Sequence, residues 1–288
     1  MSRELLGAPV ADALDAKTRK RVAQLQAHGV VPTLAIVRVG EKPDQVSYER
    51  GATRRCEKVG VAVHAEHLAA DVSQGEVMAC IERLNGDAGV HGILLLAPLP
   101  ASLDGDAVRN AIAVEKDVDV ANDVSLNGVF IDDARAFAPC TPQACIEMLD
   151  YYQVPLEGKR AVVLGRSLVV GKPVSMLLLD RNATVTICHS RTADMPAVAR
   201  EADVLVVAIG RERMVGAEYV RAGQTVIDVG INYNEDERRL YGDVDYEAVK
   251  DIVDAITPVP KGVGAVTISV LVSHVVESAE KAYAQLSA

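Results

Sequence analysis

Tyr48 and Ala52 lie on the same face of a short predicted helix, and the contrast between them bears on what chemistry the chain can perform. The stretch SYERGATRRCEKVG, residues 47–60, has the pattern of an amphipathic helix, in which residues four apart are neighbours. A tyrosine there could orient a substrate or relay a proton, whereas an alanine can do neither. The stretch therefore raises the question of which chemistry remains to a site in which Ala52 stands next to Tyr48.

A second candidate site follows the predicted strand RAVVLG, residues 160–165. The next loop contains Gly165, Ser167 and Gly171. It leads into a helix that begins near Pro173, where proline suits the first helical turn. Such a loop lets backbone N–H groups and the positive end of the helix approach a phosphate. Because the spacing departs from GxGxxG, the pattern alone fits a plain tight turn equally well.

The end of the following strand, TVTICHSRT, tells the two interpretations apart. Enzymes that prefer NAD usually place an acidic residue there, which holds the ribose 2′-hydroxyl and would repel a 2′-phosphate. This chain has His189, Ser190 and Arg191 at that point, and Arg166 is available from the first loop. Two arginines and a hydroxyl favour the additional phosphate of NADP. The alternative is that these residues are solvated surface side chains.

Composition and charge exclude several classes of protein. A chain of 288 residues with 49% hydrophobic content is long enough for a substantial core and two domains. Its apolar runs are too short for a membrane span and its start lacks a signal-peptide core, so we expect a soluble cytoplasmic protein with no membrane partner. The formal charge of −10 argues against nucleic acid as the main partner. Scattered cysteines and histidines indicate reduced thiols and no metal site.

Helical and strand patterns alternate along the chain, which is typical of βαβ units. The first series has helices at 10–29, 46–59 and GEVMACIERLNG, and strands at TLAIVRVG, VAVHAEHL and GILLLAPLP. The second series, after an irregular loop at 115–140, consists of TPQACIEMLDYY, RAVVLG, KPVSMLLLDR, TVTICHS, DVLVVAIG, QTVIDVG and a final helix from about Val266. This order predicts an α/β protein with two α/β domains and mostly parallel sheets.

The sequence resembles the methylenetetrahydrofolate dehydrogenase/cyclohydrolase (FolD-type) family nearly end to end. The motifs that carry the resemblance include VRVGEKPDQVSYERGATRRCEKVG, GILLLAPLP, EKDVD, FAPCTPQACIEML, VVLGRSLVVGKPVSMLLL, ATVTICHSRT, VIDVGIN, GDVDY and ITPVPKGVGAVT. The resemblance implies an N-terminal folate-binding catalytic domain at 1–140, joined by the C-terminal helix at about 266–288. It also implies a Rossmann-like NADP-binding domain at 141–265 with a cleft between the two. The cofactor would be NADP or NAD, the substrate a tetrahydrofolate derivative, and the protein a homodimer.

The resemblance also assigns roles to single residues. Tyr48 matches a pterin-stacking tyrosine and Asp119 an aspartate that would hydrogen-bond the pterin ring, and we expect both to be catalytic. The family's lysine falls on Ala52. Its GILVQLPLP motif reads GILLLAPLP here, so that we expect Leu95 to replace an active-site glutamine. The other expected site residues are Pro98, Gly262 and Val263 for substrate, and Gly165, Arg166, Ser167, Gly171, His189, Ser190, Arg191, Ile231 and Thr267 for cofactor.

Two segments depart from the family's motifs. VANDVSLNG, residues 120–128, stands where GFHPxNxG is common. PKGVGAVT places Lys261 and Ala265 where glycine and proline are common. Lys261 either faces solvent or, as a hypothesis, reaches the folate and partly replaces the missing lysine.

The two reactions of the family make different demands on these residues. Oxidation of the methylene bridge moves a hydride, and the neighbouring nitrogen lone pair stabilises the cation that remains, so the protein mainly has to position its ligands. Opening of the methenyl ring by water needs a general base and acid. Ala52 and Leu95 can supply neither, and Arg55, two turns from Tyr48, stays protonated.

The sequence therefore predicts an NADP-dependent methylenetetrahydrofolate dehydrogenase whose cyclohydrolase activity is weak or absent. Two alternatives stay open. One is a bifunctional enzyme that recruits another base, such as Tyr48 with Asp119 or Lys261, and produces 10-formyltetrahydrofolate. The other is a non-catalytic folate- or nucleotide-binding protein.

Overall fold

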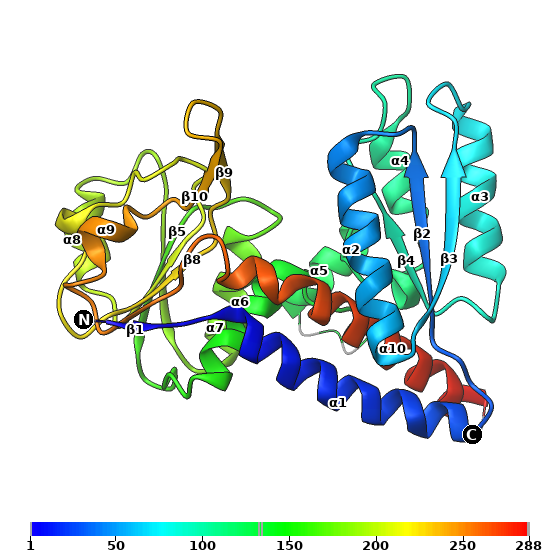
Figure 1. The fold of residues 1–288 in the computed structure, drawn as a ribbon, viewed down its shortest axis with the longest axis horizontal. Helices are drawn as coiled ribbons and strands as arrows, with labels where there is room; N and C mark the ends of the chain where they lie inside the picture. Colours follow the sequence, from blue (N-terminus) through cyan, green and yellow to red (C-terminus); the bar gives the residue numbers. More distant parts are fainter. Residues whose placement is uncertain (1, 132, 134, 287–288) are drawn as a thin grey trace. The chain divides into compact units, whose positions relative to one another are not determined.

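The computed structural model describes residues 2–131, 133 and 135–286, which form two compact units. The first unit in the chain comprises Ala13–Cys140 and the residues from Ile268 on. The second comprises the residues up to Asp12 together with Thr141–Thr267. Each unit contains a sheet of parallel strands (Figure 1), as the alternation of helical and strand patterns predicts.

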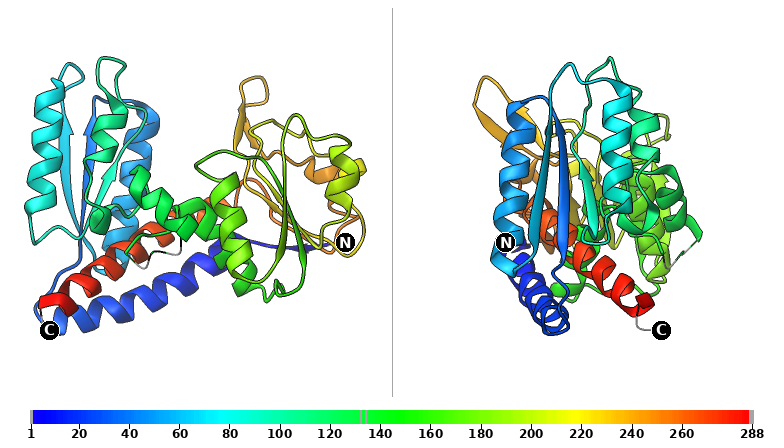
Figure 2. Two further views of the ribbon diagram at one scale, coloured as in Figure 1. Left: turned by 180° about the vertical axis from the view of Figure 1, so that it is seen from behind. Right: turned by 90° about the vertical axis from the view of Figure 1, so that its right-hand side faces the viewer.

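The unit built on Ala13–Cys140 has a three-stranded sheet in the order β3–β2–β4. Its strands are β2 (Thr33–Val39), β3 (Ala62–Leu68) and β4 (Gly92–Leu95), and the connecting helices are α2 (Pro43–Val59) and α3 (Gln74–Gly86). In Figures 1 and 2, α2 and α3 lie on opposite sides of this sheet. Alternate residues of β2, such as Ala35 and Val37, pack with Ile81 and Leu84 of α3 in an apolar cluster.

Local sequence explains where these two helices begin and end. Pro43 starts α2, where its missing N–H costs nothing, and Gly60 ends it with φ of 87°. Ser73 and Glu76 form a capping box at the start of α3, in which each side chain binds the other residue's backbone N–H. The sequence prediction for these helices is confirmed to within a few residues.

Further helices complete this unit: α1 (Gly7–Ala27), α4 (Gly105–Asn110), η1 (Val114–Lys116), α5 (Asp123–Ile131) and α10 (Thr267–Leu286). Arg21 of α1 forms an ion pair of 2.6 Å with Glu280 of α10. Ser278 of α10 donates a hydrogen bond of 2.8 Å to the carbonyl of Glu115. These contacts attach the last helix to the N-terminal part of the chain, as the family resemblance implies.

The other unit has a six-stranded sheet in which all neighbouring strands pair in parallel. In spatial order the strands are β1 (Arg3–Glu4), β11 (Ala255–Ile256), β8 (Thr225–Asp228), β7 (Val204–Val207), β5 (Arg160–Leu164) and β6 (Thr184–Cys188). Its other elements are α6 (Cys140–Tyr151), α7 (Gly171–Asp180), α8 (Met195–Arg200), η2 (Ala217–Tyr219), the hairpin β9 (Asn232–Asn234) and β10 (Arg239–Tyr241), α9 (Tyr246–Val249) and η3 (Val263–Ala265). Strand β5 has β6 on one side and β7 on the other, so the chain order reverses at β5, and α/β proteins commonly bind nucleotides in the loops at such a point.

The structure corrects the predicted boundary at the N-terminus. The prediction assigned residues 1–140 to one domain, but β1 pairs with β11, so that Arg3 lies opposite Ala255. Leu5 is fully buried, and Gly7 donates a hydrogen bond of 2.8 Å to the carbonyl of Lys261. A strand of two residues carries no periodic pattern, and its partner lies about 250 residues away in the sequence, so local analysis could not find the pairing.

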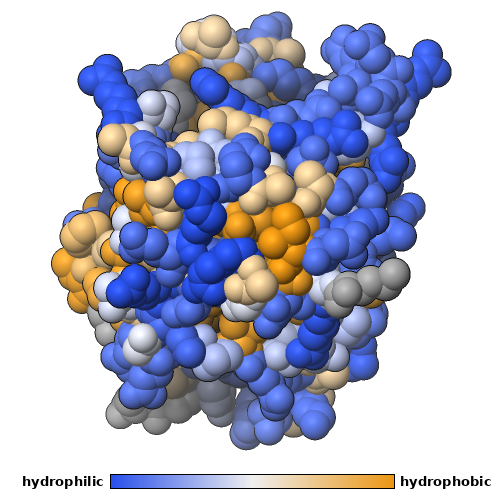
Figure 3. All heavy atoms as spheres, turned by 90° about the vertical axis from the view of Figure 1, so that its left-hand side faces the viewer, coloured by the Kyte–Doolittle hydropathy of each residue, from blue (hydrophilic) through white to orange (hydrophobic). Residues whose placement is uncertain are grey.

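The surface agrees with the charged composition of the chain. Figure 3 shows a face on which hydrophilic residues predominate and hydrophobic residues gather in separate patches. Among the described residues, none of the helices combines the length and the apolar character that crossing a membrane requires.

The core beneath α3 provides a test of the fold. Ile81 is 0% exposed, and its replacement by alanine should lower the free energy of unfolding by about 2–5 kcal/mol, because buried apolar contacts are lost and a cavity remains. Glu82→Ala, on the exposed side of the same helix, should change it by less than about 0.5 kcal/mol. Urea unfolding of both variants measures the difference, and equal midpoints would contradict this packing.

Candidate active site

Helix α2 carries Tyr48 at the rim of its buried face. Gln45, Ala52, Cys56 and Val59 form that face, whereas Tyr48 is 37% exposed. Ala52 is 0% exposed, one turn from Tyr48. The structure therefore leaves the phenol within reach of a ligand and leaves no proton-carrying group at position 52.

Three polar side chains from distant parts of the chain meet in this unit. The phenol of Tyr48 is close enough to the Asp119 carboxyl and the Cys140 thiol to feel their charge. The Cys140 thiol donates a hydrogen bond of 3.5 Å to the carbonyl of Val118 and lies close enough to the Asp119 carboxyl to affect its pKa. His274 of α10 lies behind them, with Nδ1 2.9 Å from the carbonyl of Val118 and 3.9 Å from the Cys140 sulfur. The predicted pair of Tyr48 and Asp119 is thus brought together, and the sequence analysis missed Cys140 and His274.

Burial decides the protonation states in this cluster. Burial raises the pKa of Tyr48 above its ordinary value, and the Asp119 carboxylate raises it further, so the phenol stays protonated at neutral pH and can donate a hydrogen bond. Burial also raises the pKa of Asp119 to about 6, against the effect of the nearby Cys140 thiol, which lowers it. The carboxyl is therefore mostly ionised at pH 7 and accepts hydrogen bonds. Burial lowers the pKa of His274, which keeps this imidazole neutral.

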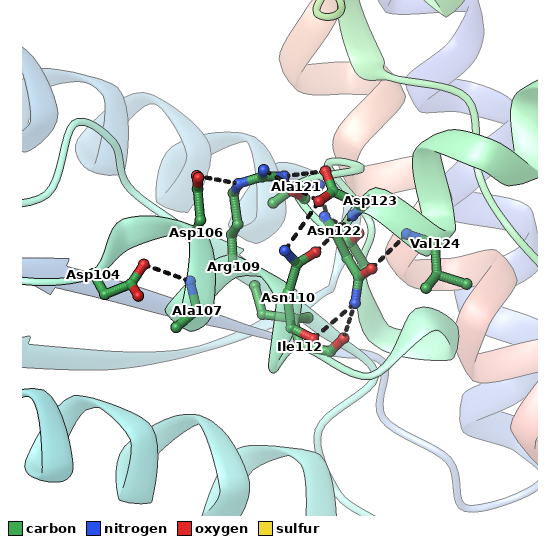
Figure 4. Close-up of polar contacts among 11 residues, drawn as sticks. Asp104, Asp106, Ala107, Arg109, Asn110, Ile112, Ala121, Asn122, Asp123 and Val124 are labelled. Atoms are coloured by element: carbon green, nitrogen blue, oxygen red, sulfur yellow. Dashed lines mark hydrogen bonds and ion pairs between the residues drawn. The ribbon is translucent and has the colours of Figure 1, made fainter.

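Asp119 lies in a tight turn with an unusual backbone. The next residue, Val120, has φ of 61°, although a branched side chain disfavours this left-handed conformation. Glycine is the residue that follows KDVD in the GFHPxNxG motif, and glycine adopts such angles freely. A non-glycine residue held there costs about 1–3 kcal/mol. The turn persists because polar contacts hold both of its ends, some of which are drawn in Figure 4.

The structure contradicts the prediction that Leu95 takes the place of the family's glutamine. Leu95 pairs in register with Val37, and both pack on the apolar cluster beneath α3. Successive strand residues point to opposite faces, and Arg38 binds Glu49 of α2 at 2.7 Å. Leu96 continues the ladder after Leu95 and therefore faces α2. Leu96 is also the fifth letter of GILLLAPLP, where GILVQLPLP has glutamine, so the earlier assignment was wrong by one residue.

The structure also shows the surroundings of Pro98, which lies near α2, and of Arg55, which belongs to α2. Pro98 lies against the start of this helix, because its carbonyl accepts hydrogen bonds of 3.1 Å from Lys42 and from Gln45. Arg55 points to another partner, since it forms an ion pair of 2.8 Å with Asp15 of α1. Arg55 is thus occupied in a structural contact and is no candidate for a base.

In the other unit, the loop after β5 has the close backbone packing of a dinucleotide-binding turn. Gly165 has φ of 126°, and a Cβ there would lie 2.1 Å from the carbonyl oxygen of Ala208. A Cβ on Gly171 would lie 2.4 Å from the carbonyl oxygen of Gly165. Ser167 accepts hydrogen bonds from the N–H groups of Val170 and Gly171 at 3.1 and 3.3 Å, which shapes the start of α7. Only glycine fits at 165 and 171, so these residues fit the cradle that a cofactor phosphate needs.

The residues predicted to bind the 2′-phosphate lie in the two loops that follow the paired strands β5 and β6. Leu164 of β5 lies opposite Cys188 of β6, so Arg166 and the segment from His189 to Arg191 begin at the same edge of the sheet. His189 fixes that segment, because its Nδ1 accepts a hydrogen bond of 3.2 Å from the Arg191 N–H. Arg166, Ser190 and Arg191 are exposed. Among the described residues, neither guanidinium group has an ion-pair or hydrogen-bond partner, which leaves both available to an anionic ligand.

A cavity of about 290 Å³ in the same unit is lined by three of the remaining predicted residues. Ile231, Gly262 and Val263 line it, together with Lys261. Lys261 is exposed and has φ of 89°, again where the family has glycine. Thr267 closes the segment, since its hydroxyl donates a hydrogen bond of 3.1 Å to the carbonyl of Gly264.

Two buried carboxylates that the sequence analysis missed hold the loops around this cavity. Asp228 accepts hydrogen bonds from the N–H groups of Gly230, Asp243 and Val244 at 3.0 to 3.1 Å. Asp243 accepts three more from residues 209–211. Burial raises the pKa of Asp228 to about 7, against these backbone donors. The only sequence signal was the motif pair VIDVGIN and GDVDY, which shows no contact between them.

No group of three or more His, Cys, Asp or Glu side chains in the described ranges is arranged to hold a metal ion. The five cysteines, all of them described, are buried and unpaired.

Comparison with known proteins supports the arrangement of both units. Residues 5–119 match the catalytic domain and residues 139–283 the NAD(P)-binding domain of tetrahydrofolate dehydrogenase/cyclohydrolase. The bifunctional protein FolD of Carboxydothermus hydrogenoformans is 52% identical over 97% of this chain and 98% of its own length.

Solved structures of FolD-type enzymes have the same fold as this chain. The bifunctional FolD of Campylobacter jejuni has a TM-score of 0.93 at 35% identity, over 98% of this chain and 99% of that one. The Trypanosoma brucei methylenetetrahydrofolate dehydrogenase-cyclohydrolase, complexed with NADP cofactor and an inhibitor, has a TM-score of 0.90 at 32% identity, over 98% of both chains.

The raised pKa of Asp119 predicts a pH-dependent contribution to stability. Between the ordinary value of 3.8 and about 6, the native carboxyl holds a proton that the unfolded chain has lost, so this group's contribution falls as pH rises through that window. The free energy of unfolding of the wild type, compared with that of Asp119→Asn, should fall between about pH 4 and pH 6. Above about pH 6, the difference between the two proteins should stay constant. Urea midpoints of both proteins give the comparison, and a difference that is also constant between about pH 4 and pH 6 would refute the shift.

Proposed function

Because the chain belongs to the tetrahydrofolate dehydrogenase/cyclohydrolase family, we propose that it oxidises 5,10-methylenetetrahydrofolate to 5,10-methenyltetrahydrofolate with NADP. The observation that carries this proposal is the cluster of Tyr48, Asp119 and Cys140, in which a protonated phenol lies beside an ionised carboxylate. The phenol ring offers a stacking surface and the carboxylate an acceptor for the ring N–H groups of a pterin.

Hydride transfer requires that the folate and the nicotinamide are held in a reactive orientation, and the described residues would supply this. Asp119 would anchor the pterin ring, and Tyr48 would fix the tilt of the ring by stacking. When bound, the nicotinamide of NADP accepts the hydride. The loop from Gly165 to Gly171 would hold its phosphates, and Arg166, Ser190 and Arg191 would hold the 2′-phosphate. None of these residues has to move a proton during the oxidation.

The second reaction of the family requires proton transfer, and we propose that it is slow in this chain. Ala52 and Leu96 occupy the positions of the family's lysine and glutamine, and neither carries an exchangeable proton. Tyr48 cannot act as a base at neutral pH, because its raised pKa keeps the phenol protonated. Arg55 is paired with Asp15.

A bifunctional enzyme is the second candidate, and two observations favour it. The relatives at 52% and 35% identity are named as bifunctional. In addition, the Asp119 carboxyl has a pKa of about 6, which lies close to the range suited to a general base at neutral pH. This candidate produces 10-formyltetrahydrofolate with Asp119 as the base and Tyr48 as the proton donor. The names of the relatives favour a bifunctional enzyme, whereas the side chains at positions 52 and 96 favour a dehydrogenase alone.

Product analysis separates the two candidates. With methylenetetrahydrofolate and NADP, the wild type should accumulate methenyltetrahydrofolate, which is followed by its absorbance. Hydrolysis of this product should be no faster than in an enzyme-free control. Ala52→Lys with Leu96→Gln should raise enzyme-dependent hydrolysis by about 100-fold, because a general base and its partner are restored. Ala52→Met with Leu96→Gln fills the same space without an amine and should not. Rapid hydrolysis by the wild type would establish the bifunctional candidate, and NADP binding without any turnover would indicate a non-catalytic protein.

Cofactor preference tests the predicted phosphate site. Arg191→Ala should raise KM for NADP by about 10-fold and leave KM for NAD nearly unchanged, because only NADP loses a charge-assisted hydrogen bond. Arg160→Ala removes an exposed arginine of the same unit whose partner is Glu201, and serves as the matched control. Steady-state kinetics with both cofactors decide, and a wild type that prefers NAD would overturn the assignment. The homodimer and the cytoplasmic location remain predictions.

A further inference from the structure

The turn that carries Asp119 has a backbone conformation that its own side chains disfavour. Val120 adopts φ of 61°, and a branched residue would readily leave this region if the chain on either side could shift. The position therefore needs restraint from outside the turn. Contacts on both sides of Val120 supply that restraint.

On the N-terminal side, the buried carboxylate of Asp117 folds the turn back on itself. Its Oδ1 accepts the N–H of Ala121 at 2.9 Å, and its Oδ2 accepts the N–H of Asn122 at 2.8 Å. The Asp117 carbonyl accepts the N–H of Val120 at 3.3 Å. These bonds close the turn but do not attach it to another element.

On the C-terminal side, Figure 4 shows the turn fastened to the end of α4. Arg109 donates to both carboxylate oxygens of Asp123, at 2.6 and 3.3 Å, and to the carbonyl of Ala121 at 2.9 Å. Asn110 exchanges hydrogen bonds with Asp123, from its amide to the carboxylate at 3.1 Å and from the Asp123 N–H at 2.8 Å. The Asn122 amide donates to the carbonyls of Asn110 and Ile112 at 3.1 and 2.9 Å.

We propose that Arg109, Asn110, Asn122 and Asp123, here called the α4–α5 network, are positioning residues for the folate. By holding residues 121–123 against α4, the network keeps Val120 left-handed and Asp119 directed at Tyr48 and Cys140. Release of this end lets Val120 relax and turns the carboxylate away from the pterin. The network thus does the work that glycine does in the GFHPxNxG motif, and the inference rests on the proposed function.

Two aspartates that both bind Arg109 provide a matched test. Asp123→Ala removes the carboxylate through which Arg109 and Asn110 hold the turn and leaves, between Arg109 and the turn, only the bond to the Ala121 carbonyl. Asp106→Ala removes a carboxylate that binds Arg109 at 3.0 Å but is not part of the contacts with the turn. Both aspartates are exposed, at 59% and 83% of their side chains. KM for methylenetetrahydrofolate should rise by about 10-fold in Asp123→Ala and by less than about 2-fold in Asp106→Ala. KM for NADP should stay unchanged in both.

Rescue by glycine separates positioning from general stabilisation. Glycine adopts the left-handed conformation without steric cost, so Val120→Gly added to Asp123→Ala should return KM for the folate to within about 3-fold of the wild-type value. A network that only stabilised the fold would give no rescue, because Val120→Gly restores none of the lost hydrogen bonds. Thermal unfolding of the same variants shows whether stability and KM move separately.

Equal KM values in Asp123→Ala and Asp106→Ala, or a double variant no better than Asp123→Ala, would overturn the proposal. A wild type that does not reduce NADP would instead overturn the proposed function. In that case, calorimetric Kd values for tetrahydrofolate with the same variants test the network, and the same order of affinities is expected.

Discussion

Parallel pairing of buried strands is the constraint on which both parts of the candidate site depend. Strands that run in parallel end at one edge of the sheet, so the loops that follow them begin side by side. Leu164 lies opposite Cys188, which brings together the loops of Gly165 and His189. Val37 lies opposite Leu95, which brings the start of α2 next to Pro98. The strand register thereby selects which loop residues can act together.

Buried carboxylates then fix the shape of those loops. Asp117, Asp228 and Asp243 are buried, and each accepts hydrogen bonds from two or three backbone N–H groups of a turn. A carboxylate only accepts hydrogen bonds, so it suits a loop whose N–H groups all point inward. Burial raises the pKa of Asp117 and Asp228, and the backbone donors offset part of that cost. These side chains shape the loops of the candidate site through backbone hydrogen bonds.

In the function that we propose, the same arrangement serves hydride transfer better than proton transfer. A stacked ring, an anchored pterin and a phosphate cradle are enough to align a donor carbon with nicotinamide. Hydrolysis also needs a group that can exchange a proton at neutral pH. With Ala52 and Leu96 at the family's polar positions, Asp119 is the group of the described cluster whose pKa, about 6, comes nearest to that requirement. In the proposed function, two buried positions therefore change the distribution of activities while the fold stays the same.

The sequence by itself determined the order of the main helices and strands, the presence of two α/β units and the family, because hydrophobic periodicity and long motifs are local properties of the chain. It also singled out Tyr48, Asp119 and the glycines of the loop after β5 as candidate site residues. Tertiary structure alone decided which strand face Leu95 occupies, that β1 joins β11, that Arg55 is paired with Asp15, and that Val120 is left-handed. Each of these depends on partners distant in the sequence or on burial, and a pKa such as that of Asp119 exists only after the chain has excluded water from the group.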